Sequence, residues 1–176
     1  MATIKIGNLF HNVSPKADIF ITTNRVIKKD GTLTMGAGIA LEAKQRYPQL
    51  PAYFAHYINT HYKDKDCYHI IPPMQVDPPP DRHVSSEWSI GAIQTKVNWK
   101  DPSPSDLILC SLRHLDTWAV QQALTKEKRR LHCPIPGIGK GGLDFWIVLD
   151  MIHTACNNDN ITFWISEEYV KGQTRR

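Results

Sequence analysis

Several features that would assign this chain to a class of protein are missing. Its 176 residues contain no apolar run near the ~18–20 residues that cross a bilayer. The first ten residues, MATIKIGNLF, are too polar for a secretory signal. We therefore expect a cytoplasmic protein that has no membrane partner.

Closely spaced cysteines, which mark many metal and redox motifs, are also absent. The four cysteines are far apart: Cys67, Cys110, Cys133 and Cys156. At least two of them lie in apolar runs, which is typical of buried reduced thiols rather than of disulfides or zinc ligands. His56 and His61 are five residues apart, not the four that place two ligands on one helix face. We expect neither a metal nor a cofactor.

A strong charge of either sign is missing as well. The formal net charge is +4, which suits an anionic ligand but falls far short of a nucleic-acid-binding composition. The basic segments 126–130 and KGQTRR are expected to be solvated. Three tryptophans are predicted to fill the core or a pocket wall rather than to stack on nucleic-acid bases: Trp99, Trp146 and Trp164.

No internal repeat is present, and apolar runs alternate with helix-periodic segments. We expect one domain over residues 1–170 and a basic C-terminal tail over 171–176. Strands are predicted over residues 3–9, 17–23, 67–72, 88–95, 131–136 and 161–166. Helices are predicted over residues 36–48, 50–62, 103–124 and 143–156, the third with Ser105 as its cap. This order predicts an α/β fold whose largely parallel sheet has helices on both faces.

One segment interrupts this alternation. Residues 72–87, PPMQVDPPPDRHVSSE, contain five prolines. Proline lacks the N–H that a strand ladder needs, so this segment is predicted to be a stiff surface loop.

Two glycine-rich segments each follow a predicted strand and open a predicted helix. The first is TMGAGIALEAK, with Gly36 and Gly38, and the second is PIPGIGKGGLDFW, with Gly137, Gly139, Gly141 and Gly142. The second matches G-x-G-x-x-G only weakly, because too few strands follow it for a Rossmann half, and no Walker GK[ST] is present. Each segment alone could be a tight turn. Together, at the carboxyl ends of parallel strands, they could hold a diphosphate from both sides.

The motifs GNLF, ADIFITTN, MGAGIALEAKQRYP and PIPGIGKGGLDFW, in this order, resemble the macrodomains, a family that binds ADP-ribose. The stretch IQTKVNWKDPS, residues 93–103, is similar to the lysine-dependent branch, the DarG-type antitoxins among them. That branch removes ADP-ribose from protein carboxylates or from thymidine in DNA. The resemblance covers nearly the whole chain. It implies a three-layer α/β/α macrodomain with a central mixed, largely parallel sheet.

The resemblance also implies roles for individual residues. Asn8 would accept a hydrogen bond from the adenine amine through its amide oxygen, where many macrodomains have aspartate. The other expected ligand-binding residues are Asn24, Gly36, Ala37, Gly38, Ile39, Thr95, Pro136, Gly137, Ile138, Gly139, Lys140, Gly141, Gly142 and Leu143. Lys96 would attack the anomeric carbon of the distal ribose, and Asp144 would move protons on the ribose oxygens.

Each of these roles has a simpler alternative. Lys96 could be a surface lysine or an electrostatic clamp, and Asp144 could be a helix-start carboxylate that favours the macrodipole. Asn24 either orients the distal ribose or ends its strand.

The activity that this resemblance implies is that of an ADP-ribosyl glycohydrolase, a hydrolase that acts on ADP-ribosylated DNA or protein. One alternative is a phosphatase for ADP-ribose 1″-phosphate, which would use the same pocket. Another is a non-catalytic reader of ADP-ribose. The expected partner is ADP-ribose or an ADP-ribosylated macromolecule, and we expect a monomer.

Overall fold

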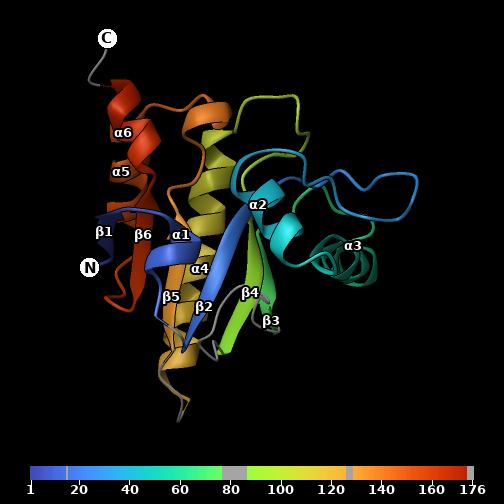
Figure 1. Cartoon of the computed structure of the whole chain (residues 1–176), viewed down its shortest axis with the longest axis horizontal. Coiled ribbons are helices and arrows are strands. Elements are labelled where there is room, and N and C mark those ends of the chain that lie inside the picture. Colours follow the sequence, from blue (N-terminus) through green and yellow to red (C-terminus); the bar gives the residue numbers. More distant parts are fainter. Residues whose placement is uncertain (15, 77–86, 126–128, 174–176) are drawn as a thin grey trace.

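A six-stranded sheet forms the centre of the computed structural model, which describes residues 1–14, 16–76, 87–125 and 129–173. The strands are β1 (Thr3–Ile6), β2 (Lys16–Thr23), β3 (Ile70–Gln75), β4 (Glu87–Gln94), β5 (Arg130–Pro134) and β6 (Ile161–Ile165). Their order in the sheet is β1-β6-β5-β2-β4-β3 (Figure 1). Neighbouring strands are parallel except β3 and β4, which are antiparallel. The mixed, largely parallel sheet is as predicted.

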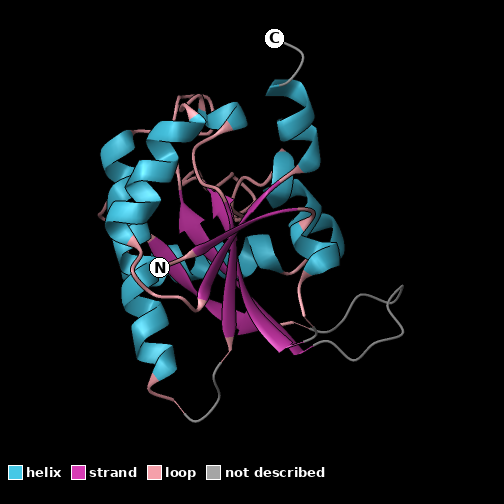
Figure 2. Ribbon diagram, turned by 90° about the vertical axis from the view of Figure 1, so that its left-hand side faces the viewer, coloured by secondary structure: helices cyan, strands magenta, loops and turns pink. Residues whose placement is uncertain are grey.

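Helices cover both faces of this sheet (Figure 2). They are α1 (Leu9–Asn12), α2 (Gly38–Arg46), α3 (Leu50–His61), α4 (Ser105–Ala123), α5 (Phe145–Ala155) and α6 (Glu167–Gln173). Within the described part of the chain, none is long and apolar enough to cross a membrane.

The core consists of two apolar clusters, one on each face of the sheet. In β2, Ile19 and Ile21 belong to the cluster under α2 and α3, whereas Phe20 belongs to the cluster under α4 and α5. Successive side chains of a strand point to opposite faces, so a strand covered on both sides reads as a continuous apolar run. This explains why the sequence ADIFITT predicted β2 so directly.

The thiols behave as the sequence predicted. Cys133 and Cys156 are buried and reduced, while Cys67 and Cys110 are partly buried. Burial, helped by the charge of Asp116, raises the pKa of Cys156 to about 12. These two buried thiols therefore act as small apolar side chains.

The predicted loop over residues 72–87 was wrong at both ends, because β3 extends through Pro72 and Pro73 to Gln75 and β4 begins at Glu87. Two features allow prolines there. β3 lies at the edge of the sheet and pairs with β4 alone, and its register shifts between Ile71 and Met74. Gly91 of β4 faces this irregularity, where an added Cβ would lie 2.5 Å from the Ile71 carbonyl oxygen. Residues 77–86 of the predicted loop lie outside the described residues.

The other differences are the ends of elements and two helices, α1 and α6, that the sequence did not predict. The predicted first strand stops at Ile6, and the short helix α1 follows it. Pro104, not Ser105, is the N-cap of α4, and its side chain makes no capping hydrogen bond. Helix α6 includes residues 171–173, which the sequence had assigned to the tail.

Candidate functional site

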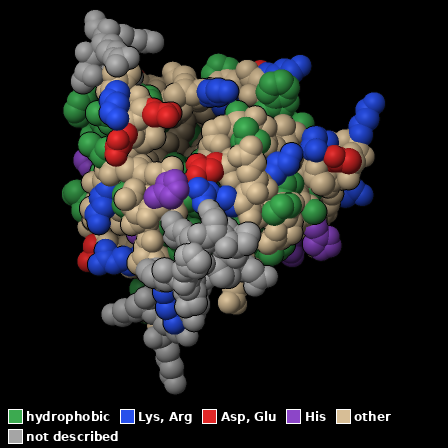
Figure 3. All heavy atoms as spheres, viewed as in Figure 1, with side chains coloured by type: hydrophobic (Ala, Val, Ile, Leu, Met, Phe, Trp, Pro, Cys, Tyr) green, Lys and Arg blue, Asp and Glu red, His purple; other side chains and the backbone are tan. Residues whose placement is uncertain are grey.

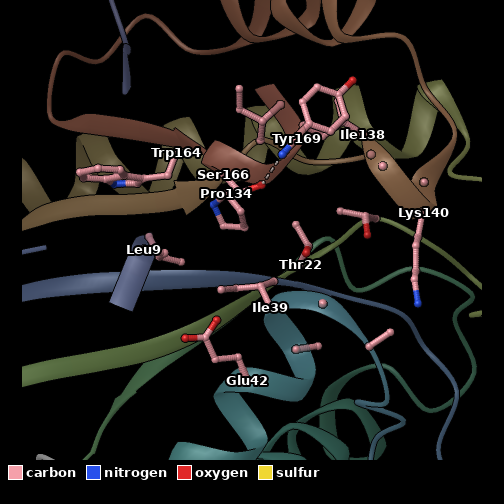
Figure 4. Close-up of a pocket in the computed structure, with 18 of the residues that line it drawn as sticks. Leu9, Thr22, Ile39, Glu42, Pro134, Ile138, Lys140, Trp164, Ser166 and Tyr169 are labelled. Carbon is pink, nitrogen blue, oxygen red and sulfur yellow. Dashed lines mark hydrogen bonds between the residues drawn. The ribbon is translucent and has the colours of Figure 1, made fainter. Parts of the chain in front are cut away.

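A cleft of about 1590 Å³ lies at the carboxyl ends of the parallel strands (Figure 4). Thr23 at the end of β2, Thr95 after β4 and Ile135 after β5 line it. The carboxyl ends of parallel strands lie at one edge of a sheet, which is where open α/β sheets bind ligands. In Figure 4, Leu9 and Ile39 lie on one side of the space, and Trp164 and Pro134 lie on the other.

Most of the residues that the sequence indicated come together in this cleft. Those that line it are Asn8, Asn24, Gly36, Ala37, Gly38, Ile39, Thr95, Lys96, Gly137, Ile138, Gly139, Lys140 and Gly141. Four lie outside its lining: Pro136, Gly142, Leu143 and Asp144. The two glycine segments therefore meet in one space.

The first glycine segment presents the start of α2 to the cleft. Its N-cap, Ala37, has no side chain that could accept the first helical N–H groups. Such N–H groups lack partners within the helix, and the helix dipole adds positive potential there. The start of α2 is therefore suited to an anionic group.

The second glycine segment is a compact loop after β5. Gly137 has a φ of +78°, and a Cβ there would lie 2.8 Å from Leu143 Cδ1. The Leu143 N–H donates to the Gly137 carbonyl over 3.0 Å, and the Ser103 N–H donates to the Gly141 carbonyl over 2.9 Å. These two bonds hold the loop against the wall of the cleft.

Lys96 reaches this loop from the end of β4. Its Nζ donates a hydrogen bond of 2.8 Å to the carbonyl oxygen of Lys140. The preceding residue is anchored, because Thr95 donates to the Thr23 carbonyl through both its N–H (2.9 Å) and its Oγ1 (3.1 Å). A primary amine therefore lies beside the backbone of the glycine loop.

Asp144 is exposed and is the N-cap of α5. Its Oδ1 accepts from the N–H of Trp146 over 2.8 Å and from the N–H of Ile147 over 3.4 Å. The structure thus gives Asp144 the helix-start position that the sequence left open.

Two asparagines of the cleft, Asn24 and Asn8, hold backbone in place. Asn24 Nδ2 donates to the Thr34 carbonyl over 2.8 Å, and its Oδ1 accepts from the Val26 N–H over 2.8 Å. It thereby shapes the segment between β2 and α2. Asn8 caps α1 through an oxygen that accepts from the Phe10 N–H over 2.8 Å.

Trp164 forms part of the buried wall of the cleft. Its Nε1 donates to His132 Nδ1 over 3.0 Å. Burial, together with the nearby charges of Lys5 and Arg130, lowers the pKa of His132 to about 4. The imidazole is therefore neutral near pH 7 and can accept this bond.

The other two tryptophans are more exposed. Trp99 lines the cleft at 52% exposure, and Lys100 Nζ lies 5.2 Å from the centre of its ring. Trp146 is 71% exposed, so its predicted place in the core or a pocket wall was wrong. Helix α5 buries Val148 and Ile152, and Trp146 lies two residues before Val148, on the opposite side of the helix.

No family model and no curated protein matches the sequence. Solved structures do match the fold. The macrodomain of Thermus aquaticus DarG aligns with a TM-score of 0.66 and 22% identity, covering 95% of this chain and 98% of that one. The macrodomain of Mycobacterium tuberculosis DarG aligns with a TM-score of 0.64 and 22% identity, covering 93% of this chain and 97% of that one. This chain has the macrodomain fold.

The three-layer macrodomain architecture predicted from the sequence is thus confirmed, and it resembles the DarG type. Thermosipho africanus DarTG, solved in complex with ADP-ribose, aligns with a TM-score of 0.68 and 17% identity. That alignment covers 96% of this chain and 43% of the longer one.

The cleft also contains residues that the sequence patterns missed. Ser166, Glu167, Tyr169 and Lys171 line it from the end of β6 and from α6. Their signal was position, because they follow a parallel strand whose carboxyl end lies at the same edge. Ser103 was missed too, and its buried Oγ has no hydrogen-bond partner among the described residues. Across those same residues, no three His, Cys, Asp or Glu side chains are grouped to hold a metal ion.

Proposed function

We propose that this protein binds ADP-ribose and releases it from modified macromolecules. The observation that carries the proposal is that both glycine segments and the Lys96 amine meet in one cleft. An uncapped helix start and a glycine loop are suited to the two phosphates of a diphosphate. The likeness to a DarTG structure that contains ADP-ribose supports this ligand.

The cleft suggests how such a ligand lies. Its base would enter the apolar end between Leu9 and Trp164, and its diphosphate would lie between α2 and the glycine loop. The distal ribose would then reach Lys96 and Lys140, which are joined by the 2.8 Å hydrogen bond. This order leaves the anomeric carbon nearest the amine.

For the reaction, we propose that the neutral Lys96 amine attacks the anomeric carbon. A bond forms between Nζ and C1″, and the bond from C1″ to the leaving group breaks, its electron pair departing with that group. Nζ gives up a proton, and the leaving group takes one up. Water then attacks C1″ and frees the amine, so that one water is consumed for each ADP-ribose released.

The mouth of the cleft favours a nucleic-acid substrate. Trp99 offers a half-exposed ring on which a base next to the modified nucleotide can stack, and Lys100 can meet a backbone phosphate. Lys and Arg side chains are interspersed with acidic ones on the face in Figure 3. We therefore propose local contact with ADP-ribosylated thymidine in DNA rather than an extended basic surface.

The activity is tested on three substrates side by side. These are an ADP-ribosylated thymidine oligonucleotide, a protein carrying ester-linked ADP-ribose, and ADP-ribose 1″-phosphate. We expect release of ADP-ribose from the oligonucleotide and micromolar affinity for free ADP-ribose, roughly −8 kcal/mol by calorimetry. Phosphate release from the third substrate alone would replace the proposal by a phosphatase, and binding without any turnover would replace it by a reader.

Two substitutions test whether Lys96 acts as a nucleophile or only as a positive charge that binds the ligand. Lys96→Arg keeps the positive charge and can still donate to the Lys140 carbonyl, but its guanidinium is not a nucleophile at neutral pH. We expect this variant to bind ADP-ribose within about threefold of the wild type and to lose turnover, by roughly 10³-fold or more. Lys96→Ala should lose turnover as well. Substantial turnover by Lys96→Arg would show that Lys96 acts through its positive charge and not as a nucleophile.

A further inference from the structure

One end of the cleft has the shape and polarity of a site for a flat aromatic base. Leu9 and Trp164 are 3% and 7% exposed and face each other across the space in Figure 4, with Ile39 and Pro134 beside them. Asn8 precedes Leu9 and lines the same end. A base between these apolar walls would meet the amide of Asn8 at its edge.

The orientation of that amide is set by its neighbours. Phe10 N–H donates to it over 2.8 Å, so the oxygen must be the atom that faces α1. The amide nitrogen is on the other branch of the carboxamide and is therefore not the atom that meets the Phe10 N–H. Among the hydrogen bonds of the described residues, Asn8 Nδ2 has no partner, and it is a donor only.

The backbone N–H of Asn8 has a partner as well. Its N–H donates to Asn12 Oδ1 over 2.8 Å. The contact is close, because a Cβ added to Gly7 would lie 2.6 Å from the same oxygen. Among the described residues, the amide nitrogen of Asn8 is thus left available to a ligand, whereas its backbone N–H is not.

Three other polar side chains near this end each have one partner among the described residues. Trp164 Nε1 donates to His132, and Ser166 Oγ accepts from the Tyr169 N–H over 3.3 Å. Glu42, which also lines the cleft, is paired with Arg46 over 3.0 Å. The amide nitrogen of Asn8 differs from these three groups, because it has no partner among the described residues.

We propose that Asn8 reads the nucleobase as a hydrogen-bond donor, so that the cleft accepts a 6-oxopurine such as hypoxanthine about as well as adenine. This inference rests on the proposed ADP-ribose site. Adenine presents an amine donor beside the ring acceptor N1, whereas hypoxanthine presents a carbonyl acceptor. A carboxylate at position 8 can only accept, and would favour the amine. The Asn8 amide nitrogen can donate to N1 of adenine or to O6 of hypoxanthine, a role that differs from the acceptor role expected from the sequence.

The experiment compares ADP-ribose with inosine diphosphate ribose by calorimetry. We expect the wild type to bind the two ligands within about threefold of each other. In Asn8→Asp, one oxygen still caps Phe10 and the other faces the base as an acceptor. The ratio of the two dissociation constants should shift in favour of ADP-ribose by about tenfold or more. Both ligands carry the same charge, so general repulsion by the new carboxylate cancels in the ratio.

A second variant controls for the fold. Asn8→Ser keeps a capping oxygen but removes the amide nitrogen, and we expect it to weaken both ligands by a similar factor. Thermal unfolding should stay close to that of the wild type for both variants.

Each outcome decides the proposal. A wild type that rejects inosine diphosphate ribose by more than about tenfold, or an Asn8→Asp variant with an unchanged ratio, overturns the donor role and leaves the proposed function standing. Failure of the wild type to bind either ligand overturns both.

Discussion

Gly141 lies at the point where the glycine loop touches the wall of the cleft. A Cβ added to it would lie 2.7 Å from Ser103 Oγ and 3.5 Å from Ser103 Cβ. The first distance is too short for any real contact, whereas the second is ordinary van der Waals contact. Gly141→Ala should therefore force either the loop or Ser103 to move, and Ser103 is only 4% exposed.

The cost can be estimated from this geometry. Inserting a methyl group into a packed site costs about 1–3 kcal/mol of folding free energy. The strain falls on a loop that we place against the diphosphate, so affinity for ADP-ribose should drop as well, by roughly tenfold for each 1.4 kcal/mol that binding must supply.

The same geometry predicts a rescue. Ser103→Ala removes the close oxygen and leaves the Cβ at 3.5 Å. The single variant should be close to neutral, because the hydroxyl has no partner among the described residues. In the double variant, stability and affinity should return toward the wild type, with a coupling free energy of about 1 kcal/mol or more.

The assay is urea unfolding and ADP-ribose calorimetry on the wild type, the two single variants and the double variant. A Gly141→Ala protein as stable as the wild type would refute the placement of the loop. A double variant no better than Gly141→Ala would show that Ser103 is not the obstacle.

Two other predictions concern Asp144 and His132. We propose that Asp144 moves protons on the ribose oxygens. Asp144→Ser keeps a side chain that can cap α5, so stability should be retained while turnover falls by about 10²-fold or more. Unchanged turnover would show that Asp144 serves only as the helix cap. The folded pKa of His132 lies near 4, below the usual 6.5, so stability present above pH 6.5 is lost as the pH falls toward 4, by about 3 kcal/mol. In His132→Gln the amide oxygen can still accept from Trp164. Urea unfolding above pH 6.5 and near pH 4 should show that this variant loses less stability on acidification than the wild type does. An equal loss of stability would contradict this.

The sequence predicted those parts of the molecule that depend on the periodic spacing of apolar residues within one segment. Ile19 and Phe20 belong to a run that only a strand covered on both faces would have, and the helices α3, α4 and α5 follow helical periodicity. The meeting of the two glycine segments was predictable as well, because parallel strands bring their carboxyl ends to one edge.

What could not be predicted depends on neighbours distant in sequence. Pro72 and Pro73 read as loop residues, and their place in β3 depends on its edge position and on Gly91 opposite. Nothing in the sequence indicated that the Asn8 oxygen would accept from the Phe10 N–H, since the residues GNLF also suit the end of a strand. The sequence showed that the Asp144 carboxylate follows a run of glycines, but it did not predict that this residue lies outside the lining of the cleft.

The prolines of β3 have a consequence for how this molecule meets others of its kind. An exposed sheet edge is a template for strand addition, and an incoming strand needs a regular row of N–H donors along it. Pro72 and Pro73 lack two consecutive N–H groups at the point where the register already shifts. Because successive N–H groups of a strand point to opposite sides, one of these donors is missing from the open edge. The open side of β3 is thus a poor template for the addition of a strand from another molecule.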